Sequence, residues 1–446
     1  MRLRRAFLLS FLILPIRIAP AAASVCTTEA TPGATLLLPY FEVDLANPNG
    51  LTTLFSINNA ASAAVLAHVT IWSDLAVPVA AFNVYLTGYD VQTINLRDVI
   101  VFGALPQTAS AGQDPNDTIS PKGQLSEDVD FPSCQGQLPP PALPSAFVSH
   151  LQRALTGQSS PVLQDLCAGL SYGDRVARGY ATVDTVNNCT PRVPGVDGYF
   201  AANGAPGDVT DQNVLWGIWL IVNAANGYSQ GSDMVAIVAD GIEPAISRPG
   251  HYSFYGRYVG WSAVDHRAPL ATTFAAQFGQ GGPFSAGTDL LVWRDSKVAQ
   301  AAFACPATVG QRPAWFPIGQ EAMVLFDEQE HPQVPVTCPF AAPSQPAAAG
   351  SALPTQCPPT AALLPFPAAA QRVHVGGAAL PVPFTFGWLY LDMNFADSAV
   401  TGNVPPADPL AAQAWIVATR SSNGRFAVAT DAFRLDSACA ANHYSP

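Results

Sequence analysis

Short runs of alternating apolar and polar residues dominate the chain. In the first hundred residues, turn-forming stretches such as Asn47–Gly50 separate five of these runs. The runs are residues 36–43, 51–58, 65–73, 79–86 and 91–96. A period of two is typical of β-strands, because successive side chains of a strand point to opposite faces of the sheet. Strands at this spacing indicate an all-β sandwich or barrel.

The second half of the chain repeats the pattern of the first half. The matched segments are 51–55 with 270–274, 69–74 with 290–295, and 179–184 with 387–392. The predicted hairpin at 214–239 also has a counterpart, at 414–430. We therefore predict an all-β chain of two tandem, internally duplicated antiparallel β-sandwich domains, immunoglobulin-like or jelly-roll-like, at residues 24–247 and 248–446.

Two stretches interrupt the strands. Residues 103–170 form an insertion in the first domain with two predicted short helices, one with Phe147 and Leu151 a turn apart and one beginning at Pro161. Residues 339–367 are rich in alanine and proline, and predict a surface loop because proline cannot donate a hydrogen bond to a sheet. The second domain's strands are predicted at 252–259, 270–278, 289–293, 322–326, 372–375, 384–393, 412–419 and 426–430.

The first 23 residues have the order of a secretory signal peptide. Arginines at 2, 4 and 5 precede the apolar run 6–16, and three alanines follow at 21–23. The apolar run is shorter than the ~20 residues that span a bilayer, and no later stretch is long and uninterrupted enough. We expect a cleaved signal peptide at 1–23, no transmembrane segment, and a secreted, periplasmic or extracellular location.

Eight cysteines in an exported chain indicate disulfide bonds. Cys26, Cys134, Cys167 and Cys189 lie in the first predicted domain, and Cys305, Cys338, Cys357 and Cys439 lie in the second. This even division predicts two separately cross-linked domains, and each set of four allows three connectivities. There is no C-x-x-C motif and no histidine cluster near the cysteines, so we expect no zinc site.

The charge excludes one class of partner. The formal net charge is −12, and the only lysines are Lys122 and Lys297. Nucleic-acid-binding proteins present clustered lysine and arginine to the phosphates. We therefore expect no nucleic acid as a partner.

The closest match to a catalytic motif is Gly227–Gly231, which fits the G-x-S-x-G pattern around Ser229. That pattern supplies a nucleophile where a helix follows the serine. Here an alternating strand pattern follows instead, and the counterpart hairpin at 414–430 lacks the motif. We expect no catalytic residues, and the alternative to test is a hydrolase set of Ser229, Asp265 and His266.

The stretch 251–267 gathers aromatic and polar residues that could form a sugar-binding face. Its members are Tyr252, Tyr255, Arg257, Tyr258, Trp261, Asp265 and His266. Aromatic rings stack on sugar rings while the polar groups bind hydroxyls. Aromatic residues are also favoured in strands, and we prefer the interpretation that these residues pack inside the sandwich.

Acidic loops offer the oxygen ligands that calcium prefers, above all Asp114, Asn116 and Asp117. None of these loops has the spacing of an EF-hand. We expect no cofactor and no metal, with calcium at this loop as the alternative.

The segments Leu38–Asp44 and Leu86–Asp98 resemble uncharacterised exported bacterial all-β proteins. The resemblance implies a bacterial, exported origin and no activity or site residues. We expect a non-enzymatic exported protein that is a surface, matrix or binding component. The alternatives are a secreted serine or glycoside hydrolase and a carbohydrate-binding protein, with a cell-surface glycan or protein as the partner.

Overall fold

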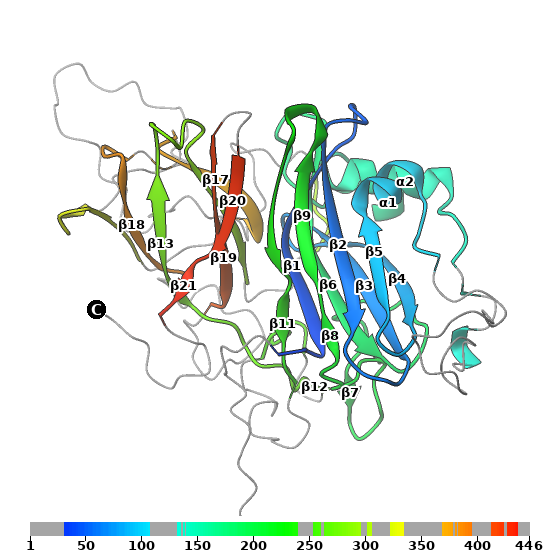
Figure 1. Ribbon diagram of the computed structural model, residues 1–446. Helices are drawn as coiled ribbons and strands as arrows, with labels where there is room; N and C mark the ends of the chain where they lie inside the picture. The colour runs from blue at the N-terminus through cyan, green and yellow to red at the C-terminus, as the bar shows by residue number, and fades with distance from the viewer. Residues whose placement is uncertain are drawn as a thin grey trace, which may run out of the picture.

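The protein consists of two β-sandwiches, which lie next to each other (Figure 1). The computed structural model describes residues 31–107, 132–134, 137–138, 140–239, 253–259, 263–295, 301–305, 322–333, 368–377, 380, 382–394, 412–422 and 426–435. Every strand pair is antiparallel among these residues. The all-β sandwich prediction is confirmed.

The first sandwich has two sheets, which we call 1a and 1b. Sheet 1a has the order β10-β9-β2-β5, with β8 paired to β2. Its strands are β2 (Leu51–Asn59), β5 (Val91–Asn95), β8 (Leu215–Trp216), β9 (Ile218–Asn223) and β10 (Tyr228–Asp233). Sheet 1b has the order β11-β1-β6-β3-β4. Its strands are β1 (Thr35–Asp44), β3 (Val65–Ser73), β4 (Pro78–Leu86), β6 (Val176–Val186) and β11 (Val235–Ile237).

The second sandwich also has two sheets, which we call 2a and 2b. Sheet 2a has the order β17-β14-β19-β20. Its strands are β14 (Thr288–Arg294), β17 (Ala370–Val375), β19 (Ala414–Ser422) and β20 (Phe426–Asp431). Sheet 2b has the order β16-β15-β18-β13-β21. Its strands are β13 (Thr273–Gly279), β15 (Ala322–Asp327), β16 (Pro332–Gln333), β18 (Phe386–Asp392) and β21 (Phe433–Arg434).

The two sandwiches have the same strand order. Reading sheet 2b backwards gives β21-β13-β18-β15-β16, which places each strand where sheet 1b has β11, β1, β6, β3 and β4. Sheet 2a backwards gives β20-β19-β14-β17, which matches the order of sheet 1a. The chain is therefore duplicated strand by strand.

Only part of the predicted matching of segments is correct. Residues 179–184 and 387–392 lie in the equivalent strands β6 and β18, and the hairpins β9–β10 and β19–β20 are also equivalent. The other two matches are wrong, because β2 corresponds to β14 rather than β13, and β3 does not correspond to β14. Neighbouring strands of a sandwich share the same alternation, so composition alone cannot tell which strand takes which place.

The two sandwiches share an interface in which sheet 2a covers sheet 1b. Leu290, Val292 and Ile416 point into the core of the second sandwich, whereas their neighbours on the opposite face join the core of the first. These neighbours are Leu291, Trp293, Trp415 and Val417. Strand β1 is consequently buried along almost its whole length. Strand β3 is buried as well, because Leu66 packs with Cys134 and Cys189, and His68 packs against Tyr199. Sheet 2a also meets the edge of sheet 1a, where the Ser232 hydroxyl of β10 donates to the Asp431 carboxylate of β20 at 3.3 Å.

A disulfide bond and backbone hydrogen bonds between Cys167 and Phe303 also join the two halves. Cys167 forms a disulfide with Cys305, across a sequence separation of 138 residues, while Cys134–Cys189 lies within the first half. The prediction of two separately cross-linked domains is therefore wrong, because folding brings Cys167 to the segment after β14. The other four cysteines lie outside the described residues.

Helices lie mainly in the insertion of the first half. Helix α2 (Ser145–Ala154) confirms the predicted helix, but the one expected at Pro161 is only a 3-10 turn, η2 (Pro161–Leu163). Helix α1 (Leu96–Phe102) was not predicted; its ends are capped by Asn95, whose side chain accepts from the Arg97 amide, and by Gly103 at φ 69°. Two more 3-10 turns are η1 (Pro132–Cys134) and η3 (Ala224–Asn226).

Several other predictions concern residues that lie outside the described ranges. The signal segment, the alanine/proline-rich loop at 339–367 and most of 103–139 lie outside them. The predicted strand at 252–259 is wrong over residues 253–259, which form turns. A small two-stranded sheet follows, formed by β12 (Ala263–Val264) and β7 (Ala201–Ala202). No helix in the described part of the chain is long and apolar enough to cross a membrane.

Candidate binding surface

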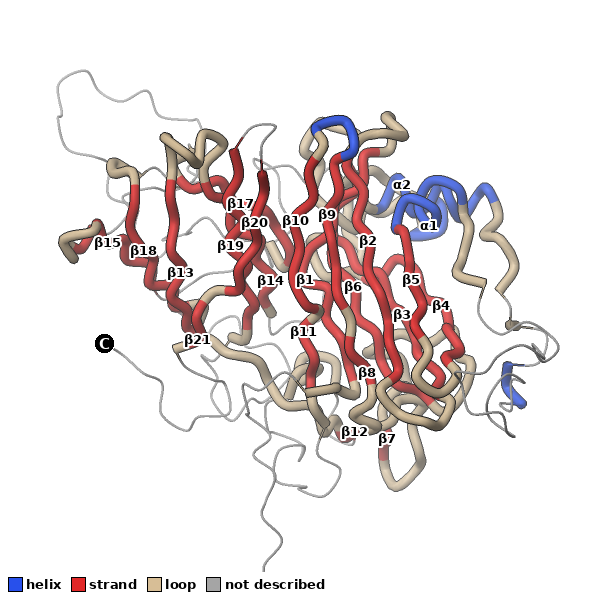
Figure 2. Tube along the Cα trace, viewed as in Figure 1, coloured by secondary structure: helices blue, strands red, loops and turns tan. Residues whose placement is uncertain are grey.

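Ser229 lies on the exposed side of strand β10, opposite Val222 of β9. A tight turn with Gly227 at φ 63° precedes it, and a strand rather than a helix carries it. The chain runs on from β10 through β11 (Figure 2), and the backbone of Ala239 then pairs with that of Arg267. Ten residues at ~3.3 Å each put Ser229 roughly 30 Å along this strand from Arg267, beyond reach of the neighbouring histidine.

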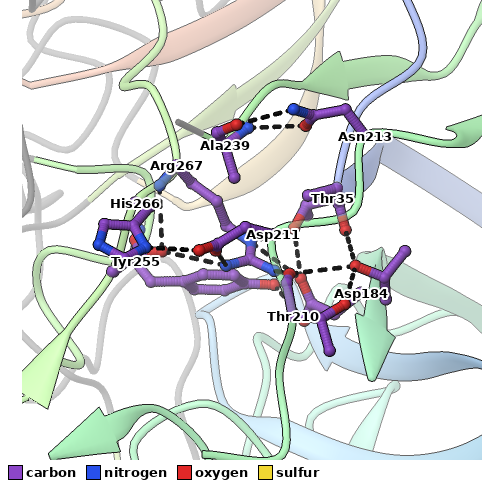
Figure 3. A network of polar contacts seen from close by, with 12 residues as sticks. Thr35, Asp184, Thr210, Asp211, Asn213, Ala239, Tyr255, His266 and Arg267 are labelled. Carbon is purple, nitrogen blue, oxygen red and sulfur yellow. Dashed lines mark hydrogen bonds and ion pairs between the residues drawn. The ribbon is translucent and has the colours of Figure 1, made fainter. Parts of the chain in front are cut away.

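Asp265 and His266 belong instead to a polar network that holds the segment 263–267 against sheet 1b (Figure 3). At its centre, the Asp184 carboxylate accepts hydrogen bonds from Thr35, Tyr199 and Tyr255, the last at 2.8 Å. Thr35, Asp184 and Tyr255 are far apart in the sequence, so the network exists only in the folded state.

Arg267 supplies the positive charge of this network. Its guanidinium is 3.2 Å from the Asp265 carboxylate and donates to the Thr210 carbonyl at 3.0 Å. Both Arg267 and Asp265 are buried. Burial raises the pKa of Asp265, and the Arg267 charge and hydrogen bonds counter part of that rise.

The edge of the network contains an ion pair between His266 and Asp211, with 2.5 Å between the imidazole Nδ1 and the carboxylate. The hydrogen bond that its imidazole donates to the Asp211 carboxylate raises the pKa of His266 above its ordinary value. Burial raises the pKa of Asp211, but His266 and Arg267 outweigh burial and lower it overall. The imidazole is therefore held by a carboxylate, and the structure brings Asp265 and His266 together without Ser229.

The aromatic residues of 251–267 do not form an exposed sugar-binding face. Phe254, Tyr255 and Arg257 are buried, and Arg257 forms a 2.8 Å ion pair with the buried Asp295. The preferred interpretation, packing inside the protein, is correct for these residues. Tyr252 and Trp261 lie outside the described residues.

This segment helps to cover an aromatic pair on the outer face of sheet 1b. Trp72 of β3 lies opposite Tyr180 of β6, and their rings are stacked with centroids 5.6 Å apart. Tyr258 packs on Trp72 at 5.3 Å, and Trp293 of sheet 2a packs on Tyr180 at 6.1 Å. The pair is thereby buried, with Trp72 fully inaccessible.

The second sandwich has the same aromatic pair in an open position. Phe326 of β15 lies opposite Trp388 of β18, which is the register of Trp72 and Tyr180 in the equivalent strands. The rings of Phe326 and Trp388 are stacked, 4.1 Å between centroids and 8° between planes. Both side chains are partly exposed rather than buried.

Trp388 lines a groove of about 610 Å³ at the end of sheet 2b. The other lining residues include aromatic, acidic and basic side chains: Phe278, Phe284, Phe386, Asp327, Glu328, Glu330 and Arg420. Aromatic walls with a few polar groups are typical of ligand sites. Sequence reasoning missed this groove, although the match of 179–184 with 387–392 identified the strand that carries Trp388.

Two charged side chains of the groove, Asp327 and Arg420, already form hydrogen bonds within the protein. The Asp327 carboxylate accepts hydrogen bonds from the backbone amides of Gln329 and His331 at 2.8 and 2.9 Å. The His331 amide contributes most to lowering the pKa of Asp327, so this carboxylate stays ionised and cannot act as a general acid near neutral pH. Arg420 donates to the Gln277 carbonyl at 2.8 Å, and partial burial lowers its pKa.

Asp114, Asn116 and Asp117, the alternative calcium loop, lie outside the described residues. Within the part of the chain that the structure describes, no three His, Cys, Asp or Glu side chains are grouped as metal ligands.

No protein-family model matches the chain, and neither a curated protein nor a solved structure does.

Proposed function

We propose that the protein is an exported, non-enzymatic component of a surface or matrix, and that it binds its partner through the aromatic groove of sheet 2b. One observation carries this proposal: the Phe326–Trp388 pair is open, whereas the equivalent Trp72–Tyr180 pair is covered. Large apolar surfaces left open on a folded protein commonly mark interaction sites.

Three features support the exported, non-enzymatic part of the proposal. The first 23 residues have the order of a signal peptide, and disulfides such as Cys134–Cys189 suit an oxidising compartment. The resemblance to exported bacterial proteins points the same way. The serine of the G-x-S-x-G match lies far from Asp265 and His266, so the hydrolase set does not assemble.

A carbohydrate is the second candidate partner at the same groove. Trp388, stacked on Phe326, offers an aromatic side chain that lines the groove together with the carboxylates of Glu328 and Glu330. Sugar rings stack on such faces, while carboxylates and guanidinium groups accept and donate hydrogen bonds to the hydroxyls.

Binding to insoluble polysaccharides and to isolated bacterial cell envelopes tests both candidates. The chain from residue 24 onwards is mixed with chitin, cellulose, peptidoglycan or envelope fragments, and the bound fraction is measured. Trp388→Ala should lower retention on the bound material about tenfold, because buried aromatic anchors dominate binding energy. Phe102→Ala is the matched control, since Phe102 is 63% exposed on α1 in the other sandwich.

The outcomes separate the candidates. Retention on a polysaccharide that Trp388→Ala abolishes supports the carbohydrate, and retention on envelopes alone supports a surface component. Retention that is equal for Trp388→Ala and wild type would refute the groove as the binding site. Release of soluble sugars or of p-nitrophenol from an ester, lost in Ser229→Ala, would favour the hydrolase.

A further inference from the structure

The interface between the two sandwiches shows how two of these sheets pack against each other. Sheet 2a, built on the same strand order as sheet 1a, covers the outer face of sheet 1b. Arg372 of β17 crosses the interface to the Glu42 carboxylate at 2.7 Å, and its guanidinium lies over the Tyr40 ring. Trp293 contributes the large apolar contact.

Sheet 2b has the equivalent outer face, and this face is exposed in part: Phe326 and Trp388 are partly exposed, whereas Thr273, Tyr390 and Asp392 are buried. The pairing of Thr273, Ala275 and Asp392 repeats the register of Thr35, Leu37 and Asp184. In the next sheet position, Phe433 of β21 lies opposite Ala275, which puts it on the outer face beside Tyr390. Phe433 is 74% exposed, the most exposed large apolar side chain in the described part of the chain.

The outer face of sheet 1a corresponds to the face of sheet 2a that packs on sheet 1b. Its exposed apolar residues are Val91 at 57%, Trp216 at 48% and Ile218 at 44%. Trp216 and Val91 both pair with Asn58 of β2, so they lie on one face of the sheet. Leu54 and Leu220 pair with each other and extend the same face, partly buried.

The outer faces of sheets 1a and 2b therefore correspond to the two halves of the internal interface. Sheet 1a has the strand order of the covering sheet, and sheet 2b has the strand order of the covered sheet. Both carry exposed apolar side chains, which cost free energy in water at roughly 25 cal/mol per Å² of apolar area.

We propose that a second copy of the chain docks the outer face of its sheet 1a onto the outer face of sheet 2b, repeating the contact between sheets 2a and 1b. The two faces differ, so the contact is heterologous, and each added copy leaves one face free for the next. The product is a head-to-tail chain or a ring. This inference rests on the proposed function, since it names the partner that covers the region of the aromatic groove.

Sedimentation velocity over a concentration series tests the proposal with residues 24–446. Wild type should form species larger than the monomer as concentration rises. Ile218→Arg places a charge on sheet 1a, and Phe433→Arg places one on sheet 2b outside the groove lining. Each should raise the concentration needed for half-assembly about tenfold or more, because an unpaired charge in an apolar contact is costly. Phe102→Arg, on the exposed end of α1, is the matched control and should assemble like wild type.

Mixing the two variants gives the decisive result. Ile218→Arg keeps an intact sheet 2b and Phe433→Arg keeps an intact sheet 1a, so an equimolar mixture should form a 1:1 dimer that stops there. Unchanged thermal unfolding of each variant shows that both are folded. A dimer in the mixture, with neither variant assembling alone, supports the proposal.

Three results would overturn it: a wild type that stays monomeric at every concentration, assembly that both variants retain, or a mixture that forms no dimer. None of them overturns the proposed function, because Ile218→Arg and Phe433→Arg leave the groove residues intact. Retention on polysaccharide or envelope by these variants, as measured above, would show that the groove binds another partner.

Discussion

Asp74 places a carboxylate at the junction of the two sandwiches. It is 2% exposed, accepts hydrogen bonds from the Leu170 amide at 3.0 Å and the Tyr172 hydroxyl at 3.2 Å, and its carbonyl accepts from the amides of Ala369 and Ala370. Burial raises the pKa of Asp74 to about 7, although the two hydrogen bonds to the carboxylate oppose the rise. We predict that this group makes the protein less stable as the pH rises.

The sign follows from the proton count of each state. The pKa is about 7 in the folded chain and 3.8 in the unfolded reference, so between these values only the folded state holds the proton. Stability from this group is therefore fully present below about pH 4 and falls as pH rises to about 7. At 1.36 kcal/mol per pKa unit, the ionised form costs on the order of 4 kcal/mol above pH 7.

Asp74→Asn removes this dependence, because the amide stays neutral at every pH. The difference in free energy of unfolding, variant minus wild type, should rise by on the order of 4 kcal/mol between pH 4 and pH 8. Urea denaturation at half-unit pH steps measures it. Asp165→Asn, at an exposed position with φ 62° that asparagine tolerates, controls for the substitution itself. A difference that stays constant across this range would refute the reasoning.

Two further substitutions test the contacts between the sandwiches. The double substitution Cys167→Ser/Cys305→Ser removes the disulfide across 138 residues. It should lower the free energy of unfolding by up to about 5 kcal/mol, because the unfolded chain gains the entropy of the opened loop. An unfolding midpoint in guanidinium that is unchanged from wild type would contradict a stabilising role. Arg372→Met leaves the nearly buried Glu42 without its 2.7 Å partner and should cost about 3 kcal/mol. In the double variant Glu42→Gln/Arg372→Met the loss should be smaller than the sum of the single losses, and strict additivity in urea melts would show that the two side chains do not interact.

The positions of the strands along the sequence were largely predictable, but their places in the sheets were not. Alternation located β1 to β5 to within a few residues, and the repeat of 179–184 at 387–392 is real. It could not distinguish β13 from β14 as the counterpart of β2, because both strands carry the same local pattern. Helix α1 was overlooked although Asn95 and Gly103 mark its two ends, since the apolar run between them also fits a strand.

The candidate site was the least predictable feature. Trp388 and Phe326 are 62 positions apart in sequence, and only the pairing of β15 with β18 stacks them. Sequence spacing favoured Ser229 and the aromatic stretch 251–267 instead. The structure exposes the serine far from His266 and packs Tyr255 and Tyr258 against the outer face of sheet 1b.

The sequence by itself determined the class of fold and its duplication, because the alternation of apolar residues is a local property that each strand needs in order to bury one face. The tertiary structure decided which faces are buried. Tyr180 and Trp388 occupy equivalent positions, yet only Tyr180 is covered, because the second sandwich packs on sheet 1b and nothing in the described chain covers sheet 2b in the same way. Burial depends on what packs against a face, and that is a property of the whole chain rather than of the strand that carries the residue.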